Sequence, residues 1–162
     1  MELALREAEL AREEDEVPIG AVVIGPPEAP PAGESVVPDA AQDVLLGSGH
    51  NATRGRCDVS AHAELLAIRA ASHRLGYQRL QECTLYTTIE PCFMCAGAAL
   101  HARLKRVVFG APDPKFGGTV SLGRLFDTVG LNHRVLHLGG VLAQEARELM
   151  QAFFRAKRKS KE

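Results

Sequence analysis

The sequence predicts one α/β domain in which helices pack on a layered sheet. Short apolar runs typical of strands alternate along the chain with segments whose apolar residues recur at helical spacing. The length of 162 residues suits a single domain, and a hydrophobic content of 46 % can supply a substantial core. We therefore expect residues 1–162 to form one domain without internal repeats.

The first half of the chain predicts an amphipathic helix followed by a β-hairpin. The helix covers residues 2–15, and its apolar stripe combines Leu3 with three alanines. Apolar strands at 18–24 and 43–48 are expected to pair as the hairpin. The connection between them, about 25–43, contains five prolines and has the composition of a loop, so we interpret it as an insertion at the hairpin tip.

The second half of the chain predicts helices and strands in alternation. In order, they are a helix at 61–75, a strand at 84–89, a helix at 92–102, a strand at 106–110, a short helix at 121–125, a strand at 134–138 and a final helix striped by Leu142, Ala146, Leu149, Met150 and Phe153. Ser60 is the expected N-cap of the first of these helices. The helix at 92–102 is apolar nearly all round, which predicts burial on several sides, against the sheet and a second subunit.

The charge distribution limits the classes of protein that fit. A net charge of −1 argues against a generally basic nucleic-acid binder, although the last segment is locally basic and can attract phosphates. Basic residues also suit the C-terminal end of a helix without any ligand. We see no signal-peptide pattern and no apolar run of membrane-spanning length, and the four cysteines do not form a disulfide framework. We expect a cytoplasmic protein that does not enter a membrane.

Two short motifs predict a metal site. They are His-Ala-Glu at 62–64 and Pro-Cys-Phe-Met-Cys at 91–95. One imidazole and two thiolates are ligands that zinc prefers, and three protein ligands leave a fourth tetrahedral position open for water. Cys92 and Cys95 are three residues apart, so both sulfurs project from one face of a helix. We expect two helix starts facing one metal held by His62, Cys92 and Cys95, with Glu64 beside it as a carboxylate that binds no metal.

Other interpretations of the cysteines remain open. A Cys-x-x-Cys pair can be a redox centre. A structural zinc site is the stronger competitor, because Cys57 or Cys83 could supply a fourth ligand and close the coordination shell. A closed site would leave Glu64 without a role, so we expect Cys57 and Cys83 to be ordinary cysteines.

These motifs resemble those of the zinc-dependent nucleobase deaminases, and more closely the bacterial tRNA-specific adenosine deaminase family. The similar segments are Val-Pro-Ile-Gly-Ala-Val at 17–22, Ala-His-Ala-Glu at 61–64, the run at 85–98 that contains Glu-Pro-Cys-Phe-Met-Cys, Arg-Val-Val-Phe-Gly-Ala at 106–111, Asn-His-Arg-Val at 132–135 and Phe-Phe-Arg at 153–155. The resemblance implies a three-layer α/β/α cytidine-deaminase-like fold with a five-stranded mixed sheet. It also implies one Zn²⁺ per subunit, a homodimer, and a tRNA anticodon stem-loop as substrate.

The resemblance also implies a reaction and a set of substrate contacts. Glu64 would act as acid and base in the conversion of the wobble adenosine to inosine. Asn51 would hydrogen-bond the target base beside Ala63, although an Asn after a strand is also a common turn residue. Asp113 and Lys115 match a loop that touches RNA, although prolines flanking Asp113 also suit a plain surface turn.

At the end of the chain, three residues are candidates for further RNA contacts. Phe154 is one step off the apolar stripe of the last helix and could stack on a splayed loop base. Arg155 and Arg158 would then contact phosphates.

Two other functions compete with tRNA editing. One is deamination of free nucleobases or nucleotides of guanine or cytosine type, and the other is a non-enzymatic, zinc-stabilised RNA-binding module.

Overall fold

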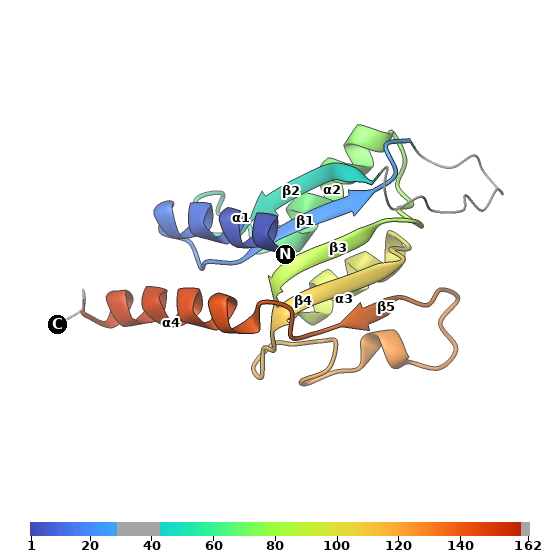
Figure 1. Ribbon diagram of the computed structural model, residues 1–162. Coiled ribbons are helices and arrows are strands. Elements are labelled where there is room, and N and C mark those ends of the chain that lie inside the picture. The colour runs from blue at the N-terminus through green and yellow to red at the C-terminus, as the bar shows by residue number, and fades with distance from the viewer. Residues whose placement is uncertain (29–42, 160–162) are drawn as a thin grey trace.

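A five-stranded mixed sheet forms the centre of the computed structural model, which describes residues 1–28 and 43–159 (Figure 1). The strands are β1 (Gly20–Gly25), β2 (Val44–His50), β3 (Thr84–Ile89), β4 (Arg106–Ala111) and β5 (Leu136–Leu138), in the order β2-β1-β3-β4-β5. β1 runs antiparallel to β2 and β3, whereas β3, β4 and β5 are parallel. The hairpin and the mixed sheet are as expected, and most of the Pro-rich insertion lies outside the described residues.

Helices cover both faces of the sheet, which confirms the three-layer α/β/α architecture. α1 (Glu2–Glu13) and α4 (Ala143–Lys159) lie on one face, and α2 (Ala63–Leu75) and α3 (Phe93–His101) lie on the other (Figure 1). The larger buried core lies under α2 and α3, and a smaller cluster of Ile89, Ala111 and Ala146 lies under α4. The two metal-motif segments both lead into helices of the same layer.

Close packing of α2 on β2 fixes the depth at which the first motif sits. The helix buries an alanine stripe at Ala63, Ala67 and Ala71. β2 presents Gly47 to that stripe, and a Cβ at Gly47 would lie 2.5 Å from the carbonyl oxygen of Ala67. Because glycine on β2 faces alanines on α2, the helix backbone approaches the strand closely, and a Cβ at Gly49 would lie 2.9 Å from the carbonyl oxygen of Ala63 at the start of the helix.

Two expectations from the sequence, a buried Leu3 and a helix at 121–125, are wrong for reasons visible in the structure. Leu3 is 41 % exposed, because α1 buries only its alanines. The short helix expected at 121–125 is absent there, and a 3₁₀ turn occurs instead at Leu125–Asp127. The backbone N–H groups of Val120 and Ser121 donate to the side chain of Glu90, so this segment is held in a loop conformation.

Two further corrections concern the elements flanking the metal motifs. The second helix begins at Ala63 instead of residue 61, and Ser60 is not its N-cap, because the Ser60 hydroxyl donates to Asp58 at 2.7 Å. α3 buries Cys95, Ala96 and Ala99, but Phe93 and Met94 are exposed. Burial of α3 on several sides is therefore not seen in this single chain. None of the helices in 1–28 and 43–159 has the length and apolar character needed to span a membrane.

Candidate active site

The candidate site lies where the carboxyl end of β3 meets the starts of α2 and α3. His62 is the residue that precedes α2, and Cys92 is the residue that precedes α3; both have extended backbone conformations. Cys95 lies in the first turn of α3. This is the arrangement of two facing helix starts that the motif spacing predicts.

The three predicted ligand atoms lie close enough together to hold one metal ion. His62 Nδ1 is 3.7 Å from Cys92 Sγ and 3.5 Å from Cys95 Sγ, and the two sulfurs are 3.6 Å apart. A tetrahedral zinc site with ordinary bond lengths requires about 3.6 Å between nitrogen and sulfur and about 3.8 Å between sulfurs. The donor set and its spacing therefore fit zinc.

Neither of the other cysteines joins this cluster. Within the part of the chain that the structure describes, His62, Cys92 and Cys95 are the one group of His, Cys, Asp or Glu residues that could hold a metal. Cys57 is exposed, and its sulfur lies 3.7 Å from the carbonyl oxygen of Arg54. Cys83 is buried, and this burial raises the pKa of its thiol to about 12. The cluster thus offers three ligands, which leaves room for a fourth from outside the chain.

Hydrogen bonds inside the cluster shift the pKa values of the two thiols in opposite directions. The Cys92 and Cys95 sulfurs lie in hydrogen-bond contact at 3.6 Å, and this bond, with a further contribution from the hydrogen bond to His62, lowers the pKa of Cys92 to about 4. The same bond to Cys92, together with burial, raises the pKa of Cys95. The hydrogen bond to Cys92 also raises the pKa of His62. Cys92 is therefore poised as a thiolate, which is the form of cysteine that binds metals.

Glu64 is a buried carboxyl group beside the ligand cluster. It lies in the first turn of α2 and is 4 % exposed. Burial raises its pKa to about 7, while hydrogen bonds from its own backbone N–H and from Cys95 oppose this shift. A carboxyl group in such surroundings can take up and release a proton near neutral pH, which is what a general acid and base requires.

Asn51 and Ala63 lie in the same site and are bonded to each other. The backbone N–H of Ala63 donates to Asn51 Oδ1 at 3.0 Å, and Asn51 is 5 % exposed. This bond satisfies an N–H in the first turn of α2, a task that the sequence assigned to Ser60. With its oxygen accepting from Ala63, Asn51 still has an amide NH₂ that can donate to a ligand.

Glu90 is the residue at this site whose role the sequence did not indicate. It directly precedes the Pro-Cys-Phe-Met-Cys motif and is 2 % exposed. Its carboxylate accepts hydrogen bonds from four backbone N–H groups and one hydroxyl, contributed by Asp113, Thr119, Val120 and Ser121. Burial alone would raise the pKa of Glu90, but the bonds from Ser121, Val120 and Asp113 lower it overall.

Through Glu90, the loop that carries Asp113 and Lys115 is brought to the start of α3. The Asp113 carboxylate accepts from the backbone N–H of Lys115 at 2.9 Å, which is a turn interaction. The Pro-flanked turn expected from the sequence is therefore present, and the same turn lies next to the ligand segment.

The residues of α4 are not brought into contact with the metal-ligand cluster. α4 lies on the opposite face of the sheet and runs past its edge (Figure 1). Phe153 is buried, as its place in the stripe predicts. The exposed Phe154 ring lies edge-on to the Phe153 ring, with 5.4 Å between the ring centres. Arg155 and Arg158 are exposed. Contact of these residues with a substrate would require a ligand that extends well beyond the cluster.

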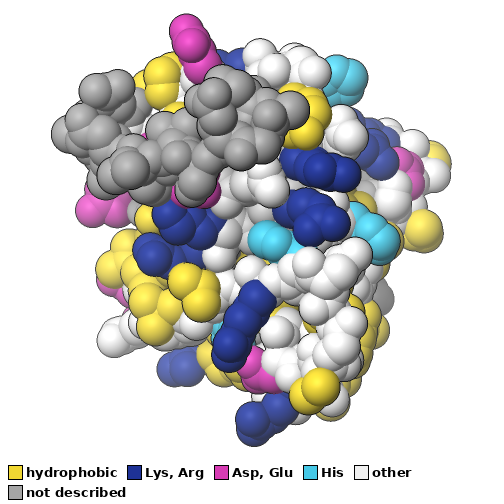
Figure 2. Space-filling model, turned by 90° about the vertical axis from the view of Figure 1, so that its right-hand side faces the viewer, with side chains coloured by type: hydrophobic (Ala, Val, Ile, Leu, Met, Phe, Trp, Pro, Cys, Tyr) yellow, Lys and Arg dark blue, Asp and Glu magenta, His cyan; other side chains and the backbone are white. Residues whose placement is uncertain are grey.

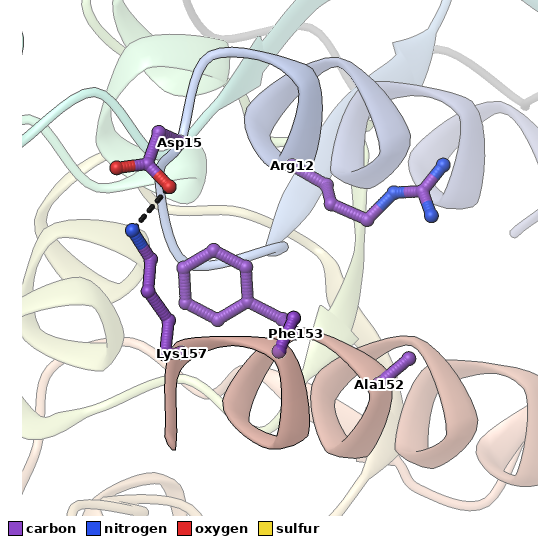
Figure 3. A pocket seen from close by; sticks show the side chains of 6 residues that line it. Arg12, Asp15, Ala152, Phe153 and Lys157 are labelled. Atoms are coloured by element: carbon purple, nitrogen blue, oxygen red, sulfur yellow. Dashed lines mark ion pairs between the residues drawn. The ribbon is translucent and has the colours of Figure 1, made fainter. Parts of the chain in front are cut away.

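A groove between α1 and α4 holds part of the basic end of the chain. It has a volume of about 370 Å³ and is lined by residues of both helices, with Lys157 paired to Asp15 along one side (Figure 3). Lys157 also lies over the Phe153 ring, 5.5 Å from its centre. The groove lining includes no His or Cys, and its acidic side chain, Asp15, is paired with Lys157 and Arg54, so we assign the chemistry to the cluster and not to this groove.

Basic side chains are not confined to the C-terminal segment. The face that forms the right-hand side of the view in Figure 1 also gathers Lys, Arg and His side chains (Figure 2). Several arginines that are scattered along the sequence are exposed, among them Arg74, Arg79, Arg106 and Arg134. The overall charge of −1 therefore conceals local positive surface.

A mixed sheet with a His-Cys-Cys cluster and a buried Glu at two helix starts defines the class of hydrolytic deaminases. The MafB19-like deaminase family model matches residues 1–158. The chain belongs to this family.

Individual relatives agree with this membership. A tRNA-specific adenosine deaminase from Agrobacterium fabrum is 42 % identical over 158 residues, which cover 98 % of this chain and 93 % of the relative. A solved structure from a study of A-to-I editing by tRNA:A34 deaminases at the wobble position has a TM-score of 0.77 and 40 % identity, with 92 % of this chain and 96 % of that chain covered. The structure of a guanine deaminase from Nitrosomonas europaea has a TM-score of 0.74 at 21 % identity, over 94 % of this chain and 81 % of that one, and so shares the fold.

Proposed function

We propose that this protein hydrolyses the wobble adenosine of a tRNA anticodon to inosine, with release of ammonia. The observation that carries the proposal is the juxtaposition of three metal-ligand atoms with the buried Glu64. Relatives of nearly the same length that are named as tRNA-specific adenosine deaminases support the choice of substrate.

His62, Cys92 and Cys95 would hold one Zn²⁺ per subunit. The ion supplies Lewis-acid activation of a water molecule when it is bound. Glu64 then accepts a proton from the attacking water, delivers a proton to the adenine ring nitrogen, and assists departure of the amino group as ammonia. One carboxylate serves each step, because its burial keeps the protonated and ionised forms both accessible near neutral pH.

The remaining residues would bind and orient the RNA. The NH₂ group of Asn51 is placed to donate to the target base, next to Ala63. Asp113 and Lys115 would contact nucleotides that flank it, and Phe154, Arg155 and Arg158 would stack on or pair with more distant parts of the stem-loop. A splayed anticodon loop suits such a site, since its bases can be turned out without breaking base pairs.

We further propose that the enzyme acts in the cytoplasm as a homodimer. The exposed Phe93 and Met94 at the start of α3 support a partner on this side of the molecule. A second copy there would cover the apolar surface that a single chain leaves open.

The proposed substrate is tested by offering the purified, zinc-loaded protein two classes of compound. One is an anticodon stem-loop with adenosine at the wobble position, with a stem-loop carrying guanosine there as the control. The other is a set of free purine and pyrimidine bases and nucleosides. We expect inosine in the adenosine stem-loop alone, detected by mass spectrometry after nuclease digestion. Release of ammonia from guanine or cytosine compounds alone would reject the editing function in favour of a small-molecule deaminase.

A further inference from the structure

Glu90 concentrates the hydrogen bonds of one distant loop on a single buried carboxylate. Each donor lies 23 to 31 residues further along the chain, in the segment from Asp113 to Ser121. The acceptor itself is two residues before the ligand Cys92. One side chain therefore joins the loop that carries Asp113 and Lys115 to the start of α3.

The two oxygens of this carboxylate accept hydrogen bonds from different sets of loop groups. Oε1 accepts from the backbone N–H groups of Thr119, Val120 and Ser121, at 3.1, 2.7 and 2.9 Å. Oε2 accepts from the backbone N–H of Asp113 at 3.0 Å and from the Ser121 hydroxyl. Oε2 is thus the acceptor for Asp113, whereas Ser121 at the far end of the loop is held by both oxygens.

The middle of the loop is pressed against the same segment. A Cβ at Gly117 would lie 2.5 Å from both carboxylate oxygens of Glu90, so this approach requires glycine. Gly117 also forms an isolated β-bridge with Cys92, and the backbone N–H of Gly118 donates to the carbonyl oxygen of Pro91 at 2.8 Å. The middle of the loop, at Gly117 and Gly118, therefore lies directly against the ligand segment.

We propose that Glu90 is a positioning residue for substrate binding, which sets Asp113 and Lys115 at a fixed place beside the metal-ligand cluster. The inference rests on the proposed function, since it assigns this loop to RNA contact. Glu90 touches neither substrate nor metal in this role. Its effect is to hold the RNA-binding loop in a fixed position relative to Cys92, so that the flanking nucleotides are bound while the target nucleotide lies at the ligand cluster.

Replacement of Glu90 by Gln tests the roles of its two oxygens separately, because one of them becomes an NH₂ group. In Glu90→Gln, the amide oxygen takes the place that faces the three N–H groups of Thr119, Val120 and Ser121, because an NH₂ group there would oppose three donors. The amide NH₂ then faces Asp113 and the Ser121 hydroxyl. The hydroxyl can reverse and accept, but the backbone N–H of Asp113 loses its acceptor. The substitution should therefore release the Asp113 end of the loop selectively.

Steady-state kinetics on the anticodon stem-loop test the proposal. We expect Glu90→Gln to raise KM about tenfold while kcat changes by less than about threefold, with zinc content unchanged. Glu82→Gln is the matched control, because Glu82 pairs with Lys105 at the other end of β3 and β4. Its kinetic constants should equal those of the wild type. Loss of zinc, or a fall in kcat alone with KM unchanged, would overturn the positioning role.

A double-mutant cycle shows whether the effect passes through Asp113. Glu90→Gln should raise KM much less in an Asp113→Ala background than in the wild type. Equal, additive effects in the two backgrounds would reject the assignment.

Amide hydrogen exchange measures the same link without RNA. In Glu90→Gln the Asp113 N–H should exchange at least about tenfold faster, while the Thr119 and Val120 N–H groups stay protected. Unchanged exchange at Asp113 would sink the inference even if the wild type edits tRNA. Conversely, failure of the wild type to edit, with the exchange result intact, would reject the proposed function and the RNA role but leave the structural link established.

Discussion

Glu64 and Glu90 expose 4 % and 2 % of their surface and lie on either side of the ligand cluster, one after His62 and the other before Cys92. Glu64 receives hydrogen bonds from its own backbone N–H and from Cys95, and burial raises its pKa to about 7. Glu90 receives five hydrogen bonds from the loop at 113–121, and its pKa is lowered in spite of burial.

The difference shows that burial alone does not decide what a carboxyl group does. When few donors surround it, burial disfavours its charged form and the group becomes able to exchange a proton. When donors fill every acceptor position, the charged form is retained and the group becomes a fixed structural anchor. The same amino acid is thus suited to proton transfer at Glu64 and to loop attachment at Glu90.

The largest effect should follow from Glu64→Gln. The amide keeps the shape of the side chain but cannot carry a proton between water and base, so we expect deamination to fall by roughly 10²- to 10⁴-fold. Metal analysis should find the zinc content unchanged, because the proposed ligands are His62, Cys92 and Cys95. Near-normal turnover of the stem-loop in this variant would remove the distinction between the two glutamates.

The next effect concerns folding stability, for which Glu90 should matter more than Glu64. Glu90→Ala leaves four backbone N–H groups without their acceptor, and we expect it to lower the free energy of unfolding by about 2–4 kcal/mol. Glu64→Ala removes a carboxyl group that burial disfavours in its charged form, and should change stability by less than about 1 kcal/mol. Denaturant unfolding of the two variants checks the ranking, and equal losses would contradict it.

The sequence predicts the role of Glu64 more readily than that of Glu90. His62, Glu64, Cys92 and Cys95 lie in two short motifs, and their chemistry depends on side-chain type and local spacing, which a sequence displays. The partners of Glu90 are mostly backbone N–H groups far along the chain. Every residue except proline has such a group, so nothing in the sequence marks those particular partners.

Local patterns also explain which parts of the fold were predictable. β3 has the expected bounds, and the alternation of strands and helices led to the observed sheet, because both depend on short-range periodicity. The cap of α2 was assigned to Ser60, whereas Asn51, twelve residues before Ala63, provides it. The expected helix at 121–125 was wrong for a similar reason, since Glu90 takes N–H groups of that segment.

A smaller loss of stability is expected from a substitution in the loop, at Gly117, which lies against the Glu90 carboxylate. In Gly117→Ala, the new Cβ would lie 2.5 Å from both Glu90 oxygens, and the hydrogen bonds of that carboxylate prevent it from moving aside. We expect destabilisation by about 1–3 kcal/mol, measured by thermal or denaturant unfolding. Gly55→Ala is the control, because within the described chain a Cβ there would have one neighbour within 4 Å, Glu16 Oε1 at 3.7 Å, which is an ordinary contact. Alanine at that position should be neutral or slightly stabilising.

The smallest effect should come from Ser121→Ala, which removes one of the five hydrogen bonds to Glu90. The hydroxyl bond to Oε2 is lost, but the backbone N–H of Ser121 keeps its bond to Oε1 at 2.9 Å. Because Ser121 is exposed, water can take the place of the hydroxyl, so we expect a loss of about 1 kcal/mol or less and a KM for the stem-loop within about twofold of wild type. The comparison with Glu90→Gln is decisive. Both changes disturb Oε2, but only the glutamine removes the acceptor of Asp113. If Ser121→Ala raised KM as much as Glu90→Gln does, the loop would depend on the Ser121 hydroxyl bond, and the attachment of Asp113 would not be what distinguishes Glu90 from Glu64.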